Sequence, residues 1–296
     1  TCMAVLFALV AAPAAAGWFF VGPEGSDGAA GRSARAPLAT VQQALEFAYP
    51  GDTVVLLPGT YHQDIRSVRS GRADAPIRIQ GPPDAVVKGA GDSHVIDIQH
   101  DYTELVGFTV DGLHGDGDVL EDYRDKLVYV HGPNAMSGIT GVRILGMSLT
   151  NAFGECLRIK TGARDNEVAY SRIETCGVRD FRFARGRKNG EGIYVGTAPE
   201  QLPGGPDRLD RSVRNHIHHN FIRPEGSECV DIKEGAEKNL VEHNVCIGQV
   251  DPDSGGINVR GNSNIIRNNV VGPSVGAGVR LGGDTDAHGI YNHVYG

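Results

Sequence analysis

The sequence predicts an all-β fold, a right-handed parallel β-helix solenoid, and two repeating patterns carry that prediction. In one pattern an asparagine recurs at Asn215, Asn239 and Asn264 and is followed by His288, in steps of 24, 25 and 24 residues. Glycine, with 41 residues, suits the many tight corners of such a fold. The other pattern is an apolar, outward, apolar triplet that begins seven segments, at residues 95–98, 127–130, 156–159, 192–195, 229–232, 256–259 and 278–281.

The N-terminal part predicts the end of the stack and a short capping helix. Thr40 is a suitable N-cap for a helix over residues 41–47, which Pro50 and Gly51 end. We expect this amphipathic helix to cover the open end of the solenoid. Strands are expected at 18–21 and 53–57, with a turn at 58–61 and a new coil from 77–80.

The chain is expected to contain one domain after a signal peptide. An apolar run ends in three alanines at Ala16, which predicts a signal peptide over residues 1–16 and a β-helix domain over 17–296. The chain starts at Thr1 and stops inside a repeat, so we expect a fragment without its first methionine and its C-terminal cap. The net charge of −8 argues against a nucleic-acid partner, and the short single apolar run argues against a membrane anchor. We therefore expect a secreted, extracellular monomer.

Four cysteines remain once Cys2 is removed with the signal peptide. Cys156 and Cys229 fall in the same column two coils apart, roughly 9.6 Å, which is beyond the reach of a disulfide. Two alternatives stay open: the disulfides Cys156–Cys176 and Cys229–Cys246, or four reduced cysteines buried in the core.

Phasing the repeats gathers polar side chains on one outer face. If Val230 and Ile232 point inward, Asp231 and Lys233 point outward. The same places are held by Asn258 and Arg260 one coil later and by Tyr194 one coil earlier. Arg158 and Lys160 occupy them on the coil before that. A second column, just before these strands, holds Glu155, Glu191, Glu228 and then Gly255.

The stacked carboxylates of Glu191 and Glu228 require a positive partner. At roughly 5 Å and an effective dielectric constant of about 20 they repel each other by about 3 kcal/mol. A hard divalent cation such as Ca²⁺ would be held by carboxylate and amide oxygens, with Asp231 or Asn189 as a further ligand. The alternative is a salt bridge to Lys233 or to the arginine-rich loop, without a metal.

Lys233 and Arg260 form the other informative pair. Like charges on neighbouring coils lower the pKa of a lysine, which would make Lys233 a usable base near neutral pH. The alternative is an exposed lysine and arginine that merely stack.

Two insertions, at residues 178–190 and 199–211, interrupt the later coils. Loops that extend a solenoid often border its binding groove. The first insertion is cationic and carries Phe181 and Phe183. Its basic residues are Arg179, Arg182, Arg185, Arg187 and Lys188. They indicate an anionic ligand, with Arg182 and Arg185 as binding candidates. The alternative is a solvated loop.

Two stretches resemble known families. Residues 19–81 resemble the N-terminal part of secreted β-helix proteins related to pectate lyases. Residues 228–233, followed by 256–261 and by Asn268-Asn269, resemble the catalytic stretch of polysaccharide lyase family 6, the chondroitinase B and alginate lyase group. That resemblance implies that Glu228 binds Ca²⁺, that Lys233 removes the C5 proton, and that Arg260 is the acid or stabiliser at the leaving oxygen. The family has a second glutamate where this chain has Gly226, and Glu191 is the candidate to replace it.

These observations predict a secreted polysaccharide lyase that cleaves an acidic, uronate-containing polysaccharide by metal-assisted β-elimination. Tyr194 and Asn258 are expected to contact the substrate. The alternatives are a uronan C5-epimerase and a non-catalytic glycan-binding β-helix.

Three further signals have simpler interpretations. The asparagine and histidine columns are expected to be structural. His216 and His218 alternate on a strand but have no Cys or carboxylate at ligand spacing. Asp251 and Asp253 are expected to form a turn, with paired carboxylates for inverting hydrolysis as the alternative.

Overall fold

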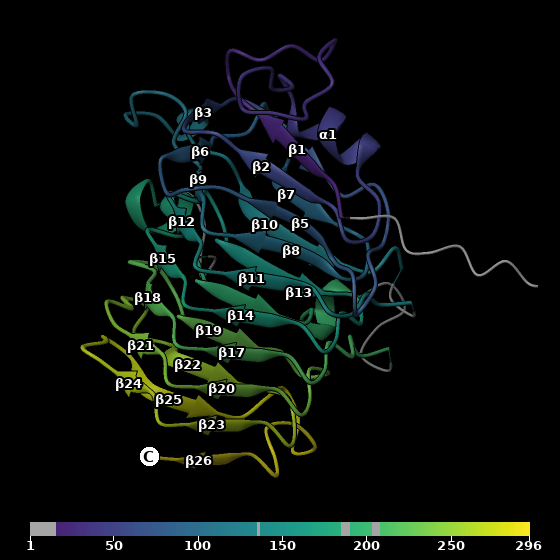
Figure 1. Cartoon of the computed structure of the whole chain (residues 1–296). Helices are drawn as coiled ribbons and strands as arrows, with labels where there is room; N and C mark the ends of the chain where they lie inside the picture. Colours follow the sequence, from purple (N-terminus) through teal and green to yellow (C-terminus); the bar gives the residue numbers. More distant parts are fainter. Residues whose placement is uncertain (1–15, 135–136, 185–189, 203–207) are drawn as a thin grey trace, which may run out of the picture.

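The computed structural model describes residues 16–134, 137–184, 190–202 and 208–296. It is a right-handed parallel β-helix of three sheets that run the length of the molecule (Figure 1). One sheet has ten strands and the other two have eight each, and neighbouring strands within them are parallel, as β19 and β22 are. The predicted fold class is therefore confirmed.

Each sheet is named here after one of its strands. The β17 sheet consists of β1 (Trp18–Val21), β2 (Thr53–Leu56), β5 (Ile77–Gln80), β8 (Thr103–Val106), β11 (Arg143–Leu145), β14 (Glu167–Ala169), β17 (His216–His218), β20 (Leu240–Glu242), β23 (Ile265–Arg267) and β26 (His293–Tyr295). The β19 sheet consists of β4 (Ile65–Arg66), β7 (His94–Ile98), β10 (Lys126–His131), β13 (Leu157–Lys160), β16 (Ile193–Val195), β19 (Val230–Ile232), β22 (Gly255–Val259) and β25 (Ala277–Leu281). The β18 sheet consists of β3 (Gly59–Tyr61), β6 (Ala85–Val87), β9 (Thr109–Asp111), β12 (Ser148–Thr150), β15 (Arg172–Glu174), β18 (Phe221–Arg223), β21 (Val245–Cys246) and β24 (Val270–Val271).

The helix α1 (Val41–Phe47) forms where the sequence predicts it. The Thr40 hydroxyl accepts a hydrogen bond from the backbone N–H of Gln43 at 3.1 Å. The helix buries Val41, Ala44 and Leu45 and lies at the β1 end of the stack (Figure 1). Short 3₁₀ helices at Leu120–Asp122 and Pro199–Gln201 and a π-helical turn at Val178–Arg182 complete the helical segments of the described chain.

The core is a continuous column of aliphatic side chains inside the coils. The inward positions of β19 and β22, such as Val230 and Ile257, are fully buried. Burial of one such side chain contributes about 1.5–3 kcal/mol, and neighbouring coils repeat it. The outward residues of the same strands are therefore held in fixed register, which is what positions the site.

Asparagine ladders run along the corners between the coils. The side-chain amide of Asn215 donates to Asn239 at 3.0 Å, and that of Asn239 donates to Asn264 at 3.1 Å. The next member is Asn292, whose side-chain oxygen accepts the backbone N–H of Asn264. The prediction of His288 is wrong, because a longer turn in the last coil moves the column to residue 292.

Two other sequence predictions have clear outcomes. Disulfides join Cys156 to Cys176 and Cys229 to Cys246, with Cα atoms 5.5 and 5.8 Å apart, so the reduced alternative is wrong. Residues 59–61, expected as a turn, form strand β3, because they pair in parallel with β6, Gly59 with Ala85 and Tyr61 with Val87. Within the described residues, we find no helix long and apolar enough to cross a membrane.

Candidate active site

The register of the β19 sheet brings the predicted outer column together. Arg158 pairs with Tyr194, Tyr194 with Asp231, and Asp231 with Asn258 on successive strands. The phasing is therefore confirmed residue by residue. These outward side chains are nevertheless buried: Asp231 is 1% exposed and Lys233 is 9% exposed.

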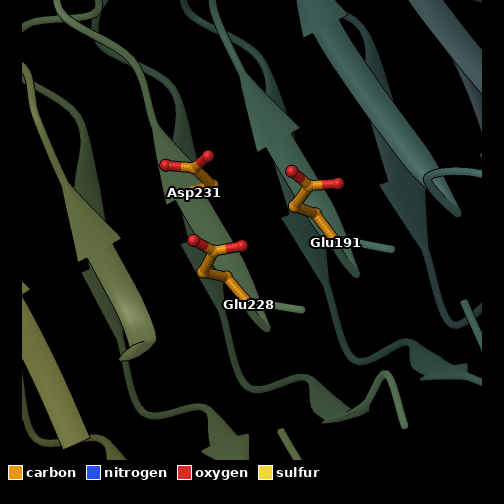
Figure 2. Close-up of side chains that lie close together, drawn as sticks. All are labelled: Glu191, Glu228 and Asp231. Carbon is orange, nitrogen blue, oxygen red and sulfur yellow. The ribbon is translucent and has the colours of Figure 1, made fainter. Parts of the chain in front are cut away.

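Three carboxylates converge beside this column. Glu228 and Asp231 lie on the β19 segment and Glu191 lies just before β16, with their carboxyl groups on the same face (Figure 2). One oxygen from each lies within 4.8 Å of the others, and this is the one such group of three found in the described part of the chain. The structure thus places the predicted metal-ligating residues together.

The protein supplies hydrogen-bond donors to these acids. The backbone N–H of Gly190 donates to Glu191 at 2.8 Å. The hydroxyls of Ser227 and Ser254 donate to the two carboxylate oxygens of Glu228. In the described residues, neither Glu191 nor Glu228 forms an ion pair with a Lys, Arg or His side chain.

Burial without a cationic partner shifts the pKa values of both glutamates upward. Burial raises the pKa of Glu191 well above its usual value, and Glu155, Glu228 and Asp231 raise it further. Burial and the nearby Asp231 raise the pKa of Glu228 to about 7, although the two serine hydrogen bonds oppose the shift. The charged forms of these acids therefore need a positive partner that the described side chains do not provide.

The donor set fits a hard divalent cation. Carboxylate oxygens in flexible arrangement are the ligands that Ca²⁺ prefers. Asn258 donates to Asp231 at 3.0 Å and leaves its own side-chain oxygen buried without a hydrogen-bond partner, so an amide oxygen is also at hand. The other suggested ligand, Asn189, lies outside the described residues.

The prediction that the pKa of Lys233 is lowered is wrong. Its Nζ atom pairs with Asp231 at 2.6 Å. Burial alone would lower the pKa of Lys233, but the charge and hydrogen bond of Asp231, the main opposing influence, raise that pKa above its usual value. Lys233 therefore forms its salt bridge with Asp231 and not with Glu191 or Glu228, as the alternative without a metal had required.

Arg260 is held by acids of its own. It pairs with buried Glu234 at 2.7 Å and also with Asp284. Burial would lower the pKa of Arg260, but Glu234 and Asp284 outweigh that effect and raise it. Arg260 is therefore a fixed positive charge and not a proton donor. The predicted lowering of the pKa of Lys233 by Arg260 does not occur.

Tyr194 lies between two cations. The guanidinium of Arg158 is 4.3 Å from the centre of the Tyr194 ring, and Nζ of Lys233 is 4.7 Å from it. Burial raises the pKa of Tyr194, so its phenol keeps its proton. Arg158, Tyr194 and Lys233 therefore form one continuous row of contacting side chains along the β19 sheet.

The cationic loop is only partly described. Arg182 donates to the hydroxyl of Tyr123 and lies over the rings of Tyr123 and Phe183. Arg185, the other predicted substrate contact, lies outside the described residues.

The other residues considered in the sequence have structural partners. His216 and His218 pair with Glu242 at 2.9 Å and with Glu167 at 3.0 Å, carboxylates on neighbouring coils that sequence spacing did not reveal. Asp253 donates its backbone N–H to Asp251 at 2.9 Å, which confirms the turn.

Sequence reasoning missed the residues that support the site. Ser227 and Ser254 precede the paired positions Glu228 and Gly255, so a serine repeated one coil apart was the available signal. Glu234 directly follows Lys233, but nothing local marks it as the partner of Arg260.

Comparison with solved structures shows which known proteins share this fold. No protein-family model and no curated protein sequence matches the chain. Among solved structures, the chain is similar to the alginate lyase from Paenibacillus sp. str. FPU-7, with 26% identity, a TM-score of 0.64, and coverage of 77% of this chain and 72% of that one. It is also similar to pectate lyase Pel9A, with 17% identity, a TM-score of 0.61, and coverage of 90% and 68%.

The fold is a pectate lyase-like parallel β-helix. A more distant similarity, to the Dettilon tailspike protein, has 12% identity and a TM-score of 0.55 over 84% of this chain and 43% of that one. The similarity to the alginate lyase supports a polysaccharide lyase function for this pectate lyase-like chain.

Proposed function

We propose that this protein is a secreted polysaccharide lyase that cleaves a uronate-containing polymer by β-elimination. One observation carries the proposal: a lysine and three clustered carboxylates share the outer face of two adjacent coils. The two disulfides fit an oxidising, extracellular compartment.

The acidic cluster is assigned to cation binding. Glu191, Glu228 and Asp231 would hold Ca²⁺, and Asn258 offers a further oxygen. When bound, the cation would neutralise a uronate carboxylate and so make the C5 proton more acidic. The chain's own contribution is to bury these acids, which largely excludes water from them.

Lys233 is assigned as the base. It carries a proton while Asp231 is charged beside it, because that ion pair raises its pKa. When the charges of Asp231 and Glu191 are compensated, burial, the largest single influence on the pKa of Lys233, favours the neutral amine. The neutral amine can then take the C5 proton.

The remaining residues serve the leaving group and the sugar. As the C5–H electron pair forms the C4=C5 double bond, the C4–O4 bond breaks and O4 leaves with its electron pair. Arg260 supplies a fixed positive charge for that oxygen, and Tyr194 keeps a proton that it can donate to a sugar oxygen. Tyr194, Asn258, Arg182 and Arg185 are the proposed substrate contacts.

The direct test is a product assay on acidic polysaccharides. Incubation with alginate, polygalacturonate and a glycosaminoglycan should raise ultraviolet absorbance from C4–C5 unsaturated uronate on one of them. Reducing ends without that absorbance would indicate a hydrolase, and solvent deuterium at C5 without cleavage would indicate an epimerase. Retention of polymer with no product would indicate a binding protein.

A further inference from the structure

An aromatic cleft lined by charged side chains of both signs lies beside the proposed site, on the coils that precede it. Three cavities of about 240, 610 and 310 Å³ all have Phe153 in their lining. Arg179 lines the first two of them and Tyr123 lines the third. We call this region the Phe153 cleft; its defining residues are Tyr123, Lys126, Phe153, Arg158, Arg179 and Phe183.

The cleft is continuous with the site. Arg158 lines its first cavity and contacts the ring of Tyr194 at 4.3 Å, and Lys233 contacts the same ring at 4.7 Å. A polymer that lies across Lys233 therefore meets Tyr194 and then the cleft as it runs toward the N-terminal coils.

The aromatic residues of the cleft are arranged to receive a sugar ring. Phe153 is half-buried, and the guanidinium of Arg179 lies 5.5 Å from the centre of its ring. Tyr123 and Phe183 meet edge to face with ring centres 6.1 Å apart. An aromatic face offers apolar area to the C–H face of a pyranose, and a neighbouring guanidinium offers paired donors to its carboxylate.

The charges of the cleft leave Arg179 as the cation for an incoming carboxylate. Lys126 and Arg158 are bound to Glu155 at 3.2 and 2.9 Å, so they compensate an acid of the protein itself. The ion pair of Arg179 with Asp180 is long, 3.8 Å, and the Arg179 side chain is 43% exposed. Acids line all three cavities, so the cleft has few cations free for a ligand: Asp125 and Glu155 line the first, Asp118 and Glu121 the second, and Asp92 and Asp125 the third.

We propose that the Phe153 cleft is a subsite for the same polymer, in which one uronate ring packs on Phe153 and its carboxylate binds Arg179. This inference rests on the proposed function for the identity of the polymer. It adds residues that position the chain without touching the reacting atoms.

The test is a binding measurement that does not depend on turnover. In a Lys233→Ala background, titration calorimetry measures the Kd of a uronate hexasaccharide prepared from alginate. Phe153→Ala should weaken binding about tenfold, which corresponds to about 1.4 kcal/mol. Phe153→Leu, which keeps apolar bulk without a ring face, should weaken it in the same direction and guards against a folding defect.

A matched pair elsewhere provides the control. Arg172 lies over the ring of Phe221 at 4.5 Å on the β18 sheet, away from the cleft residues. Phe221→Ala and Arg172→Met should leave the Kd unchanged. Arg179→Met should weaken binding of the uronate hexasaccharide but not of its carboxyl-reduced, neutral form.

The outcomes separate the two proposals. If Phe153→Ala and Arg179→Met bind like the Phe221 and Arg172 controls, or if the parent protein does not bind the hexasaccharide, the cleft proposal is overturned. If binding depends on Phe153 and Arg179 while the wild type yields no unsaturated product, the cleft stands and the lyase proposal fails.

Discussion

Glu155 and the pair Glu191 and Glu228 occupy the same column on successive coils, yet their surroundings are opposite. Glu155 binds Lys126 and Arg158 at 3.2 and 2.9 Å. Burial would raise the pKa of Glu155, but these two cations outweigh burial and lower it. Glu191 and Glu228 have raised pKa values instead.

The difference comes from what stands next to each glutamate in the repeat. Three residues after Glu155 the outer column holds Arg158, whereas after Glu191 it holds Tyr194 and after Glu228 it holds Asp231. On successive coils, the glutamate is thus followed three residues later by a cation, by a phenol and by a further acid. The fold thus tolerates a compensated glutamate on one coil and concentrates uncompensated negative charge on the next two, which is the arrangement of a cation site.

The largest expected effect is on turnover, from a substitution in the coils that carry Glu191 and Glu228. Lys233→Ala should lower turnover about 10²- to 10⁴-fold, the usual cost of losing a general base. The variant should still fold, because the inward core residues are untouched. Lys233→Arg should not restore turnover, since a guanidinium does not release its proton near neutral pH. Steady-state kinetics on the cleaved polymer measure both.

The matched control is Lys88→Ala, which removes another partly buried lysine that pairs with an aspartate, Asp111, at 2.7 Å, on the β18 sheet side. Its turnover should stay near that of the wild type. Wild-type turnover in Lys233→Ala would show that this column is not the active site.

The second prediction sets the two kinds of glutamate against each other. Glu155→Gln should lower the free energy of unfolding by about 3 kcal/mol, because it leaves Lys126 and Arg158 without their partner. In excess chelator near neutral pH, Glu191→Gln should raise it, since glutamine needs no proton to be buried. Urea denaturation followed by circular dichroism gives both values.

Opposite signs for the two substitutions are the signature of this comparison. If both variants lose stability to the same extent in chelator, Glu191 is compensated as Glu155 is, and the contrast between the coils disappears.

The pH dependence follows from Glu228. Its pKa is raised to about 7 in the folded chain from 4.5, so the folded chain binds more protons than the unfolded one between these values. Without added cation, the free energy of unfolding should therefore fall as pH rises from about 4.5 to about 7 through this group. Glu228→Gln should flatten that part of the stability profile, and a profile that Glu228→Gln leaves unaltered contradicts the assignment.

The smallest effect is expected outside the acidic coils, in the cationic loop. Arg182→Ala should weaken polymer binding a few-fold at low ionic strength and less at high ionic strength, because salt screens charges on a loop. Equal affinity for the variant and the wild type at both ionic strengths would remove Arg182 from the substrate contacts.

The repeat period made the fold and the site column predictable. Inward Val230 and Ile232 fix outward Asp231, and a step of one coil then locates Tyr194 and Asn258. The capping helix was also predictable, because Thr40 and the apolar positions that follow are local signals.

Side-chain pairing was not predictable from the period. Phase places Lys233 beside Arg260, but the direction of each side chain depends on which acid it reaches, and Lys233 reaches Asp231 while Arg260 reaches Glu234. The Phe153 cleft was missed for a similar reason, since it joins residues of different coils and loops. Phase also failed at His288, where the length of one turn changes.

Calcium binding measured by titration calorimetry on chelator-treated protein tests the central claim most directly. The wild type should bind one Ca²⁺ and release protons near pH 7, because Glu191 and Glu228 must lose theirs to bind it. Glu228→Gln should abolish or strongly weaken binding, and Glu155→Gln should retain it. Absence of Ca²⁺ binding by the wild type, or equal loss in Glu155→Gln and Glu228→Gln, would contradict the claim that the uncompensated glutamates form a cation site.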